Sequence, residues 1–286
     1  MSPTRPRTRA LVVRTAATNC EGETVRALRL AGADAELVHL NALLREPQRL
    51  AEASIFVVPG GFSYGDYVAA GRVFGYELQH GLAGELRAFV DAGGLVLGVC
   101  NGFQVLVETG LLERQEPQVS AGVRRIALTG NASGRFECRW VTLQSEDSAC
   151  PWLVPGELMP VPVAHAEGRF LVRDAATLED LRERRQIALR YVSVDAEGRV
   201  SEAAYPDDPN GSVEQIAGVC DSTGRVLGLM PHPERNLTPW EHPTWTRLGP
   251  RSEGEGLNFY RRMVEAASST ALTSHPDASR STTPAP

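Results

Sequence analysis

Apolar residues in the first third of the chain form short continuous runs that alternate with stretches of helical spacing. The runs predict strands at residues 9–14, 35–40, 54–58 and 95–99, and the spacing predicts helices at 22–30, in part of 41–53, at 82–92 and at 103–109. Strands and helices that alternate at such short intervals favour a parallel sheet with helices on both faces.

Beyond residue 110 the pattern changes to strands separated by polar turns. Predicted strands cover 123–128, 137–143, 160–164, 170–172, 187–194, 200–204, 216–220 and 226–230, and predicted helices cover 176–185 and 256–267. The pairs 187–194 with 200–204 and 216–220 with 226–230 are expected to form hairpins, because short polar turns join them.

These patterns predict one α/β domain over residues 9–268. We expect a doubly wound, mostly parallel sheet with helices on both faces, extended by antiparallel strands. Residues 1–8 are expected to be a flexible N-terminus, and the Ser-, Thr- and Pro-rich residues 269–286 a disordered tail.

Composition excludes several classes of function. No apolar run in the 286 residues approaches bilayer length, and a net charge of −6 does not favour binding to nucleic acid, so neither a membrane nor a nucleic-acid partner is expected. All 29 basic residues are arginine, which excludes a Walker A phosphate loop and a lysine Schiff base. The five cysteines are scattered, so we expect no disulfide framework, no metal site and a reducing cytoplasm as the location.

One cysteine follows a buried strand and precedes a helix. Cys100 comes directly after the apolar run 95–99, with Gly98 and Gly102 two residues to either side. This spacing is typical of a nucleophile elbow, in which a strained turn lifts the reactive side chain to a helix N-terminus that favours a thiolate. The Asn101 N–H would then point to where an oxyanion forms. The same residues are equally compatible with a buried structural cysteine beside a tight turn.

A second segment supplies a candidate base. His232 lies in the sequence Pro-His-Pro-Glu at residues 231–234, directly after a predicted strand. The proline after His232 favours an extended conformation, which would place His232 and Glu234 on one face so that the carboxylate orients the imidazole. Alone, this segment is as typical of a proline-rich surface loop, but beside a glycine-flanked cysteine it indicates a catalytic triad.

A glycine turn at the end of a neighbouring strand completes the predicted site. Pro59, Gly60 and Gly61 offer flexible backbone for a second oxyanion N–H, although an ordinary glycine turn is the better explanation when they are taken alone. Together these parts support hydrolysis of an amide through a thioester.

Residues 98–104 and 231–234 resemble the triad (class I) glutamine amidotransferases. Segments 62–67, 131–137, 164–170 and 208–212 narrow the resemblance to the glutaminase subunits of phosphoribosylformylglycinamidine synthases, from the first strand to the last helix. The resemblance implies the flavodoxin-like fold of that class. It implies Cys100 as nucleophile, His232 as acid/base, Glu234 as its orienter, Gly61 and Asn101 as oxyanion-hole donors, and Gln104 and Arg135 as contacts to glutamine.

The resemblance also implies the substrate and the partners. L-Glutamine would be the substrate, and an ATP-dependent synthetase subunit and a small accessory subunit would be the partners. This chain would hold no cofactor, with ATP and Mg on the synthetase. Segment 62–67 would serve the partner interface or the ammonia path, and a structural Ω-loop is an equal alternative.

The chain departs from the family pattern in residues 15–18, where a Pro-Gly-Ser sequence usually precedes Asn-Cys. The long stretch 236–255 has no assigned role. Three rival functions remain: a glutaminase for another acceptor, a hydrolase or deglycase with a cysteine elbow, and a binding module that keeps the fold. The binding module is disfavoured, because it would not need Cys100, His232 and Glu234 together.

Overall fold

The strands form one large sheet and one small sheet in the computed structural model, which describes residues 7–113 and 124–273. The large sheet has ten strands: β1 (Arg9–Arg14), β2 (Asp34–His39), β3 (Ile55–Val58), β4 (Leu95–Val99), β6 (Glu137–Ser145), β7 (Leu158–His165), β9 (Ile187–Val194), β10 (Val200–Glu202), β11 (Ile216–Cys220) and β12 (Val226–Leu229). The small sheet pairs β5 (Ile126–Thr129) with β8 (Arg169–Val172).

The strand order confirms the predicted fold. In the large sheet the order is β2-β1-β3-β4-β12-β11-β9-β6-β7, with β10 paired to β9. The run from β2 to β12 is parallel and has the order of flavodoxin-like folds, whereas every pair from β12 to β7 is antiparallel. Both predicted hairpins, β9 with β10 and β11 with β12, are present.

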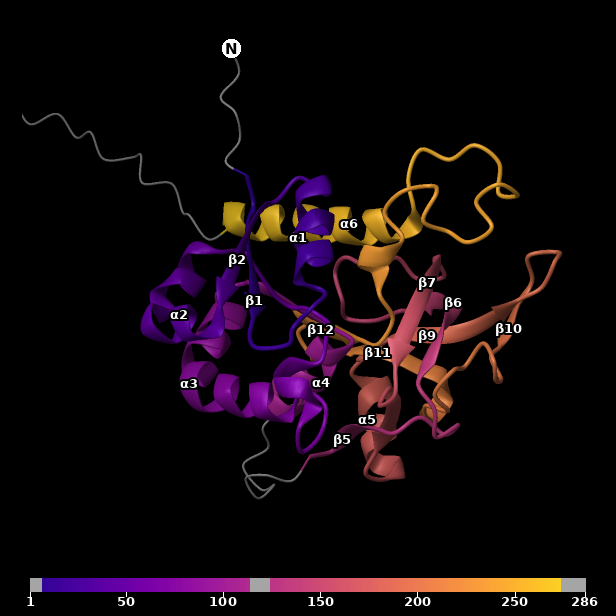
Figure 1. Ribbon diagram of the computed structural model, residues 1–286. Coiled ribbons are helices and arrows are strands. Elements are labelled where there is room, and N and C mark those ends of the chain that lie inside the picture. The colour runs from indigo at the N-terminus through magenta and orange to yellow at the C-terminus, as the bar shows by residue number, and fades with distance from the viewer. Residues whose placement is uncertain (1–6, 114–123, 274–286) are drawn as a thin grey trace, which may run out of the picture.

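Helices cover both faces of the parallel strands (Figure 1). They are α1 (Glu21–Leu30), α2 (Leu40–Arg45), α3 (Arg72–Asp91), α4 (Asn101–Thr109), α5 (Ala175–Glu183) and α6 (Glu255–Thr273), with short 3₁₀ turns at Pro47–Glu52, Ser63–Asp66, Val213–Gln215 and Pro233–Arg235. Helices α1 and α6 pack together on one face, and α3 and α4 pack together on the other.

Register brings the carboxyl ends of three strands together. Val58 at the end of β3 pairs with Gly98 in β4, which pairs on its other side with Gly228 in β12. All residues of β3, β4 and β12 are buried, as expected for central parallel strands. The loops that follow these strands therefore share one edge of the sheet, where ligands bind in open α/β folds.

Helix α3 begins ten residues before the predicted start at residue 82. Glycines hide its pattern, and two of them are there for close packing. A Cβ on Gly75 would lie 2.5 Å from the Glu108 Cβ in α4, and one on Gly81 would lie 2.3 Å from a Leu44 methyl group. Glycine lowers helix propensity, so a sequence pattern underestimates a helix that needs glycine for contact.

Both ends of the predicted domain need correction. Helix α6 continues to Thr273, so residues 269–273 belong to it and not to a disordered tail. Thr8, which was expected to be flexible, has its hydroxyl hydrogen-bonded to the Ser268 hydroxyl on α6. The rest of both predicted flexible segments, residues 1–6 and 274–286, lies outside the described residues.

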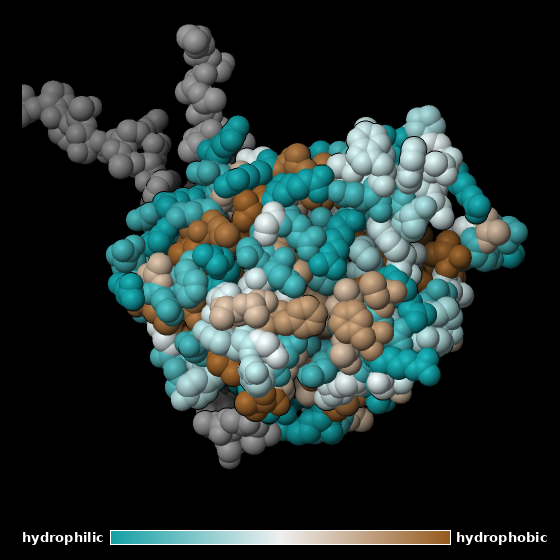
Figure 2. Space-filling model, viewed as in Figure 1, coloured by the Kyte–Doolittle hydropathy of each residue, from teal (hydrophilic) through white to brown (hydrophobic). Residues whose placement is uncertain are grey.

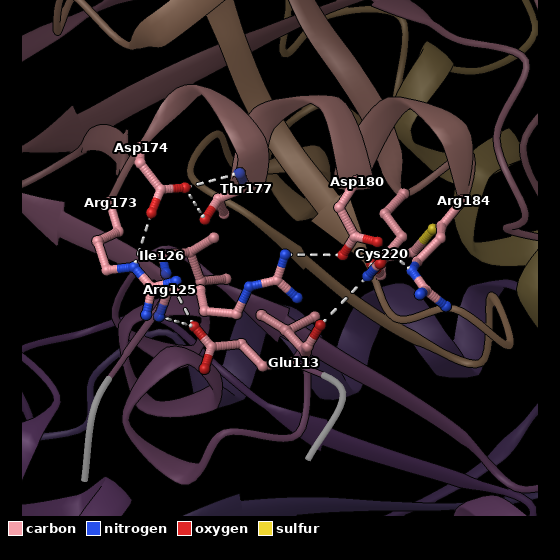
Figure 3. A network of polar contacts seen from close by, with 11 residues as sticks. Glu113, Arg125, Ile126, Arg173, Asp174, Thr177, Asp180, Arg184 and Cys220 are labelled. Carbon is pink, nitrogen blue, oxygen red and sulfur yellow. Dashed lines mark hydrogen bonds and ion pairs between the residues drawn. The ribbon is translucent and has the colours of Figure 1, made fainter. Parts of the chain in front are cut away.

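The return from α4 to the small sheet is held by polar contacts (Figure 3). The Glu113 carboxylate accepts hydrogen bonds from the N–H groups of Arg125 and Ile126 at 2.7 and 2.8 Å. Asp174 caps α5 by accepting from the Thr177 N–H at 2.8 Å. The Glu113 contacts therefore tie the segment after α4 to the first strand of the small sheet.

Hydrophobic residues on the face shown in Figure 2 form separate patches within a mainly hydrophilic surface. Exposed large apolar side chains of the chain include Phe62, Tyr67, Val68 and Phe136. Within the described ranges, every helix is too short or too polar to traverse a lipid bilayer.

Candidate active site

Cys100 forms the predicted elbow between β4 and α4. Its backbone has φ 51° and ψ −108°, a conformation that costs a non-glycine residue energy. The flanking glycines are required, because a Cβ on Gly98 would lie 2.5 Å from the Gly102 oxygen and one on Gly102 would lie 1.8 Å from the Val58 oxygen. The strain therefore places the sulfur at the N-terminus of α4.

His232 and Glu234 make the predicted contact in the loop after β12. The His232 Nδ1 and the Glu234 Oε1 lie 2.7 Å apart, and both residues are only 1% exposed. The segment is not extended as predicted, because Pro233–Arg235 forms a 3₁₀ turn. A proline at the first position of such a turn is favourable, and the turn still presents both side chains to each other. The second Glu234 oxygen accepts from the Tyr260 hydroxyl on α6 at 3.4 Å.

The environment of His232 favours its protonated form. Burial opposes the charge, but the Glu234 carboxylate and the Cys100 sulfur outweigh it and raise the pKa of His232 above its usual value. Its Nε2 atom is buried and has no hydrogen-bond partner in the described chain. The Cys100 thiol instead donates a long contact of 3.8 Å to the Ala164 oxygen. Contacts between catalytic groups are often loose before substrate binds.

Gly60 is the point where the glycine turn approaches both Cys100 and His232, the predicted nucleophile and base. A Cβ built on it would lie 2.9 Å from the His232 Cε1 and 3.4 Å from the Cys100 Cβ. Gly61 has φ +139°, which L side chains rarely adopt. Asn101 is the first residue of α4, and a helix provides no carbonyl partner for the N–H of its first residue. Asn101 therefore adjoins Cys100 directly, and Gly61 follows the glycine that approaches it; their role as oxyanion donors stays a prediction.

The two residues expected to contact glutamine lie in different surroundings. The Gln104 side chain is buried, and its amide accepts from Asn101 Nδ2 at 3.0 Å and donates to the Glu167 oxygen at 2.7 Å. Arg135 is exposed in the loop between β5 and β6. A glutamine contact for either residue stays a prediction.

Segments 131–137, 164–170 and 208–212, which resemble the family, converge behind the elbow, and of their side chains only Arg135 had a predicted role. The Asn131 Oδ1 accepts from the Gly168 N–H at 3.0 Å and lies 3.1 Å from the His165 Nδ1, and Asn210 Nδ2 donates to the Gly168 oxygen at 2.8 Å. Burial, and after it the His232 charge, lower the pKa of His165 to about 4, so this ring is neutral at neutral pH. The network shapes the turn that follows Ala164.

A second thiol lies beside the site. The Cys20 sulfur would be 3.2 Å from a Cβ on Gly60, and it accepts from the Arg235 guanidinium at 3.2 Å. Burial raises the pKa of Cys20, although Arg235 opposes the shift. Asn19 and Cys20 form the Asn-Cys pair of the family pattern, directly after the departing residues 15–18, and no role was predicted for Cys20. In residues 7–113 and 124–273, no three or more His, Cys, Asp or Glu side chains form a group that could hold a metal ion.

A flavodoxin-like sheet with Cys100, His232 and Glu234 at the carboxyl ends of its parallel strands is typical of the class of cysteine-dependent amidotransferases and hydrolases. A family model described as CobB/CobQ-like glutamine amidotransferase domain matches residues 7–266. The chain is also similar to phosphoribosylformylglycinamidine synthase subunit PurQ of Methanococcus maripaludis, with 42% identity over 79% of this chain and 82% of the relative. The same subunit of Dehalococcoides mccartyi is 41% identical over 91% of this chain and 97% of the relative.

A solved structure agrees with these relatives. A chain from the structure of PurLQS from Thermotoga maritima matches with a TM-score of 0.65 and 32% identity, over 93% of this chain and 100% of that chain. This chain therefore belongs to the PurQ family of glutamine amidotransferases.

Proposed function

We propose that this chain is the glutaminase subunit of a phosphoribosylformylglycinamidine synthase. It hydrolyses glutamine to glutamate and ammonia, and it passes the ammonia to an ATP-dependent ligase subunit. That subunit converts formylglycinamide ribonucleotide to formylglycinamidine ribonucleotide in purine biosynthesis. The observation that carries this proposal is the buried contact between His232 and Glu234 beside the Cys100 elbow, in a chain that matches PurQ relatives over most of its length.

The geometry supports attack by sulfur on the glutamine carboxamide. His232 takes the proton that Cys100 gives up on attack, because the raised pKa of the ring makes it a stronger base. The thiolate attacks the carboxamide carbon, and the N–H groups of Asn101 and Gly61 receive the developing oxyanion. His232 then protonates the leaving nitrogen, ammonia departs and a thioester remains.

The second half of the reaction uses the same groups in the opposite direction. Neutral His232 takes a proton from water, which attacks the thioester, and the proton returns to the sulfur as glutamate leaves. Glu234 holds the ring in one tautomer through Nδ1 during both halves. Gln104 and Arg135 are proposed to face the bound glutamine.

The acceptor chemistry belongs to the partner in this proposal. ATP and Mg bind the synthetase subunit, a small accessory subunit completes the complex, and this chain needs no cofactor of its own. The likeness to a chain of PurLQS supports the synthetase partner. The described cysteines are all free, which is consistent with action in a reducing cytoplasm.

The test is Cys100→Ala in the reconstituted complex. Glutamine-dependent product should fall by several orders of magnitude, because covalent catalysis is lost, while product formed from added ammonia is retained. Cys138→Ala, at an exposed cysteine, is the matched control and should keep both activities. Near wild-type use of glutamine by Cys100→Ala would refute the assignment of the nucleophile.

A further inference from the structure

The two proposed oxyanion donors lie on different segments, so other contacts must hold their N–H groups in alignment. Asn101 begins α4, whereas Gly61 belongs to the loop after β3. Nearby backbone bonds of that loop run to another segment: the N–H of Phe62 donates to the Ala17 oxygen at 3.2 Å, and that of Tyr64 to the Ala16 oxygen at 2.8 Å. These bonds do not attach the loop to the elbow.

The Asn101 side chain makes that attachment. Its Oδ1 accepts from the Ser63 N–H at 3.3 Å, and its Nδ2 donates to Asp66 Oδ1 at 3.2 Å and to Gln104 Oε1 at 3.0 Å. Asn101 is 2% exposed, and the oxygen and both hydrogens of its amide have partners. One buried amide therefore joins the loop to the elbow helix at two points.

The loop needs this bracing, because it is strained. Tyr64, Asp66 and Val68 all have positive φ values of 54°, 53° and 74°, although none is glycine. Such conformations persist only where surrounding contacts enforce them. Two of the three residues lie within three positions of Ser63, which Asn101 holds directly.

The same network reaches the turn on the other side of the sulfur. Gln104 donates to the Glu167 oxygen at 2.7 Å, and the Glu167 carboxylate accepts from the Ala70 N–H at 3.3 Å. That turn follows Ala164, whose oxygen accepts the Cys100 thiol. The Asn101 amide thus lies at the centre of contacts among the loop, the elbow and the turn.

We infer that the Asn101 side chain is a positioning residue, which aligns the Gly61 N–H with the Asn101 N–H so that both bind the oxyanion. The inference rests on the proposed glutaminase function. The side chain acts through the loop and does not touch the substrate. Asn101→Ala keeps the backbone donor of residue 101 but frees the loop.

The experiment compares Asn101→Ala, Asn101→Asp, Asp66→Asn and the double variant with the wild type in the reconstituted complex. Loss of one oxyanion donor costs about 10²–10³-fold in kcat, so misalignment of one by Asn101→Ala should cost about 10–100-fold. KM for glutamine should change much less. Asn41→Ala, at an exposed asparagine on α2, is the matched control and should keep the wild-type kcat.

The aspartate variants test the hydrogen-bond pattern itself. Asn101→Asp keeps the size but sets a carboxylate against Asp66, so kcat should fall as in Asn101→Ala. Adding Asp66→Asn supplies a new donor to that carboxylate and should restore part of kcat. Asp66→Asn alone keeps an acceptor for Asn101 and should cost less than either change at Asn101. A double variant no better than Asn101→Asp would overturn the inference.

Two readouts separate this inference from the proposed function. Hydrogen–deuterium exchange in residues 60–66 should rise in Asn101→Ala, because the Ser63 N–H loses its acceptor, and unchanged exchange overturns the inference whatever the turnover. Alkylation of Cys100 by iodoacetamide needs no oxyanion hole and should keep its wild-type rate; a matching loss of alkylation would show a collapsed elbow and overturn it too. Absence of glutamine hydrolysis by the wild-type complex would instead refute the proposed function.

Discussion

Replacing Glu234 with Gln removes one charge from the most buried contact of the site and preserves its shape. The amide oxygen can still accept from His232 Nδ1 at the 2.7 Å separation, while the amide nitrogen faces the Tyr260 hydroxyl. A hydrogen bond to a charged group is worth about 1.5–3 kcal/mol and a neutral one about 0.5–1.5 kcal/mol, so the change costs about 1–2 kcal/mol. Glutamate release should therefore fall about 5- to 30-fold in kcat/KM.

The pH profile tells whether the charge is responsible. The Glu234 carboxylate helps to raise the pKa of His232, so its removal lets the imidazolium lose its proton at lower pH. The alkaline limb of kcat/KM should shift to lower pH. The free energy of unfolding should depend on pH for the same reason. A histidine whose pKa is raised by folding stabilises the protein fully below its unfolded-state pKa of about 6.5, and this stabilisation is lost as pH rises through its folded-state pKa. The variant's stability deficit in urea unfolding should thus shrink as pH rises.

The assay is glutamate release by the complex, measured between about pH 6 and pH 9 on either side of the ordinary histidine pKa. His232→Ala should lose about 10²–10⁴-fold, because it removes the acid/base itself. Glu85→Gln, at an exposed position on α3, should behave as the wild type. An unshifted alkaline limb, or a loss as large as that of His232→Ala in a folded variant, would refute the charge argument.

Three further predictions concern the loop, the C-terminal helix and the thiols. Burial and Glu167 raise the pKa of Asp66 to about 6, so the ionised carboxylate destabilises the fold above that pH. Asp66→Asn should therefore raise the free energy of urea unfolding by about 1–2 kcal/mol near neutral pH, after allowance for solvent screening. Below about pH 4 it should raise that free energy by nothing. Truncation after Thr273 should leave the thermal midpoint unchanged, because residues 274–286 contain no large hydrophobic side chain. Truncation after Ala267 also removes Ser268, the partner of Thr8, and should lower the thermal midpoint by about 2–4 °C. In the native protein, iodoacetamide should modify Cys100 before Cys20 by mass spectrometry, and the reverse order would contradict the burial argument.

The spacing of residues along the sequence predicted those parts of the site that depend on residues close together in the chain. The elbow could be predicted because its steric demand falls on Gly98 and Gly102, both two residues from Cys100. The contact of His232 with Glu234 could also be predicted, since only one residue separates them, although the predicted backbone was wrong. The start of α3 was missed because Gly75 lowers the helical signal for a contact with Glu108, which is distant in sequence.

The rest of the site depends on contacts that no local pattern reports. Asp66 and Glu167 influence each other only because the loop after β3 meets the turn after β7. His165 reaches the site through the pairing of β6 with β7, where it lies opposite Glu137. These residues lie in segments that resemble the family, but the resemblance did not predict which way their side chains point or what they contact.

The two thiols at this edge of the sheet show that position on the backbone decides reactivity. Cys20 and Cys100 both approach Gly60, and both are buried. Cys20 precedes α1 with a negative φ of −100°, and burial raises its pKa, which keeps it a thiol despite the nearby Arg235. Cys100 lies in a strained turn at a helix N-terminus, beside the imidazole of His232, whose raised pKa favours protonation of the ring. The strained turn sets the Cys100 sulfur at the N-terminus of α4 and depends on Gly98 and Gly102, so these two glycines are as necessary to the site as the predicted triad is.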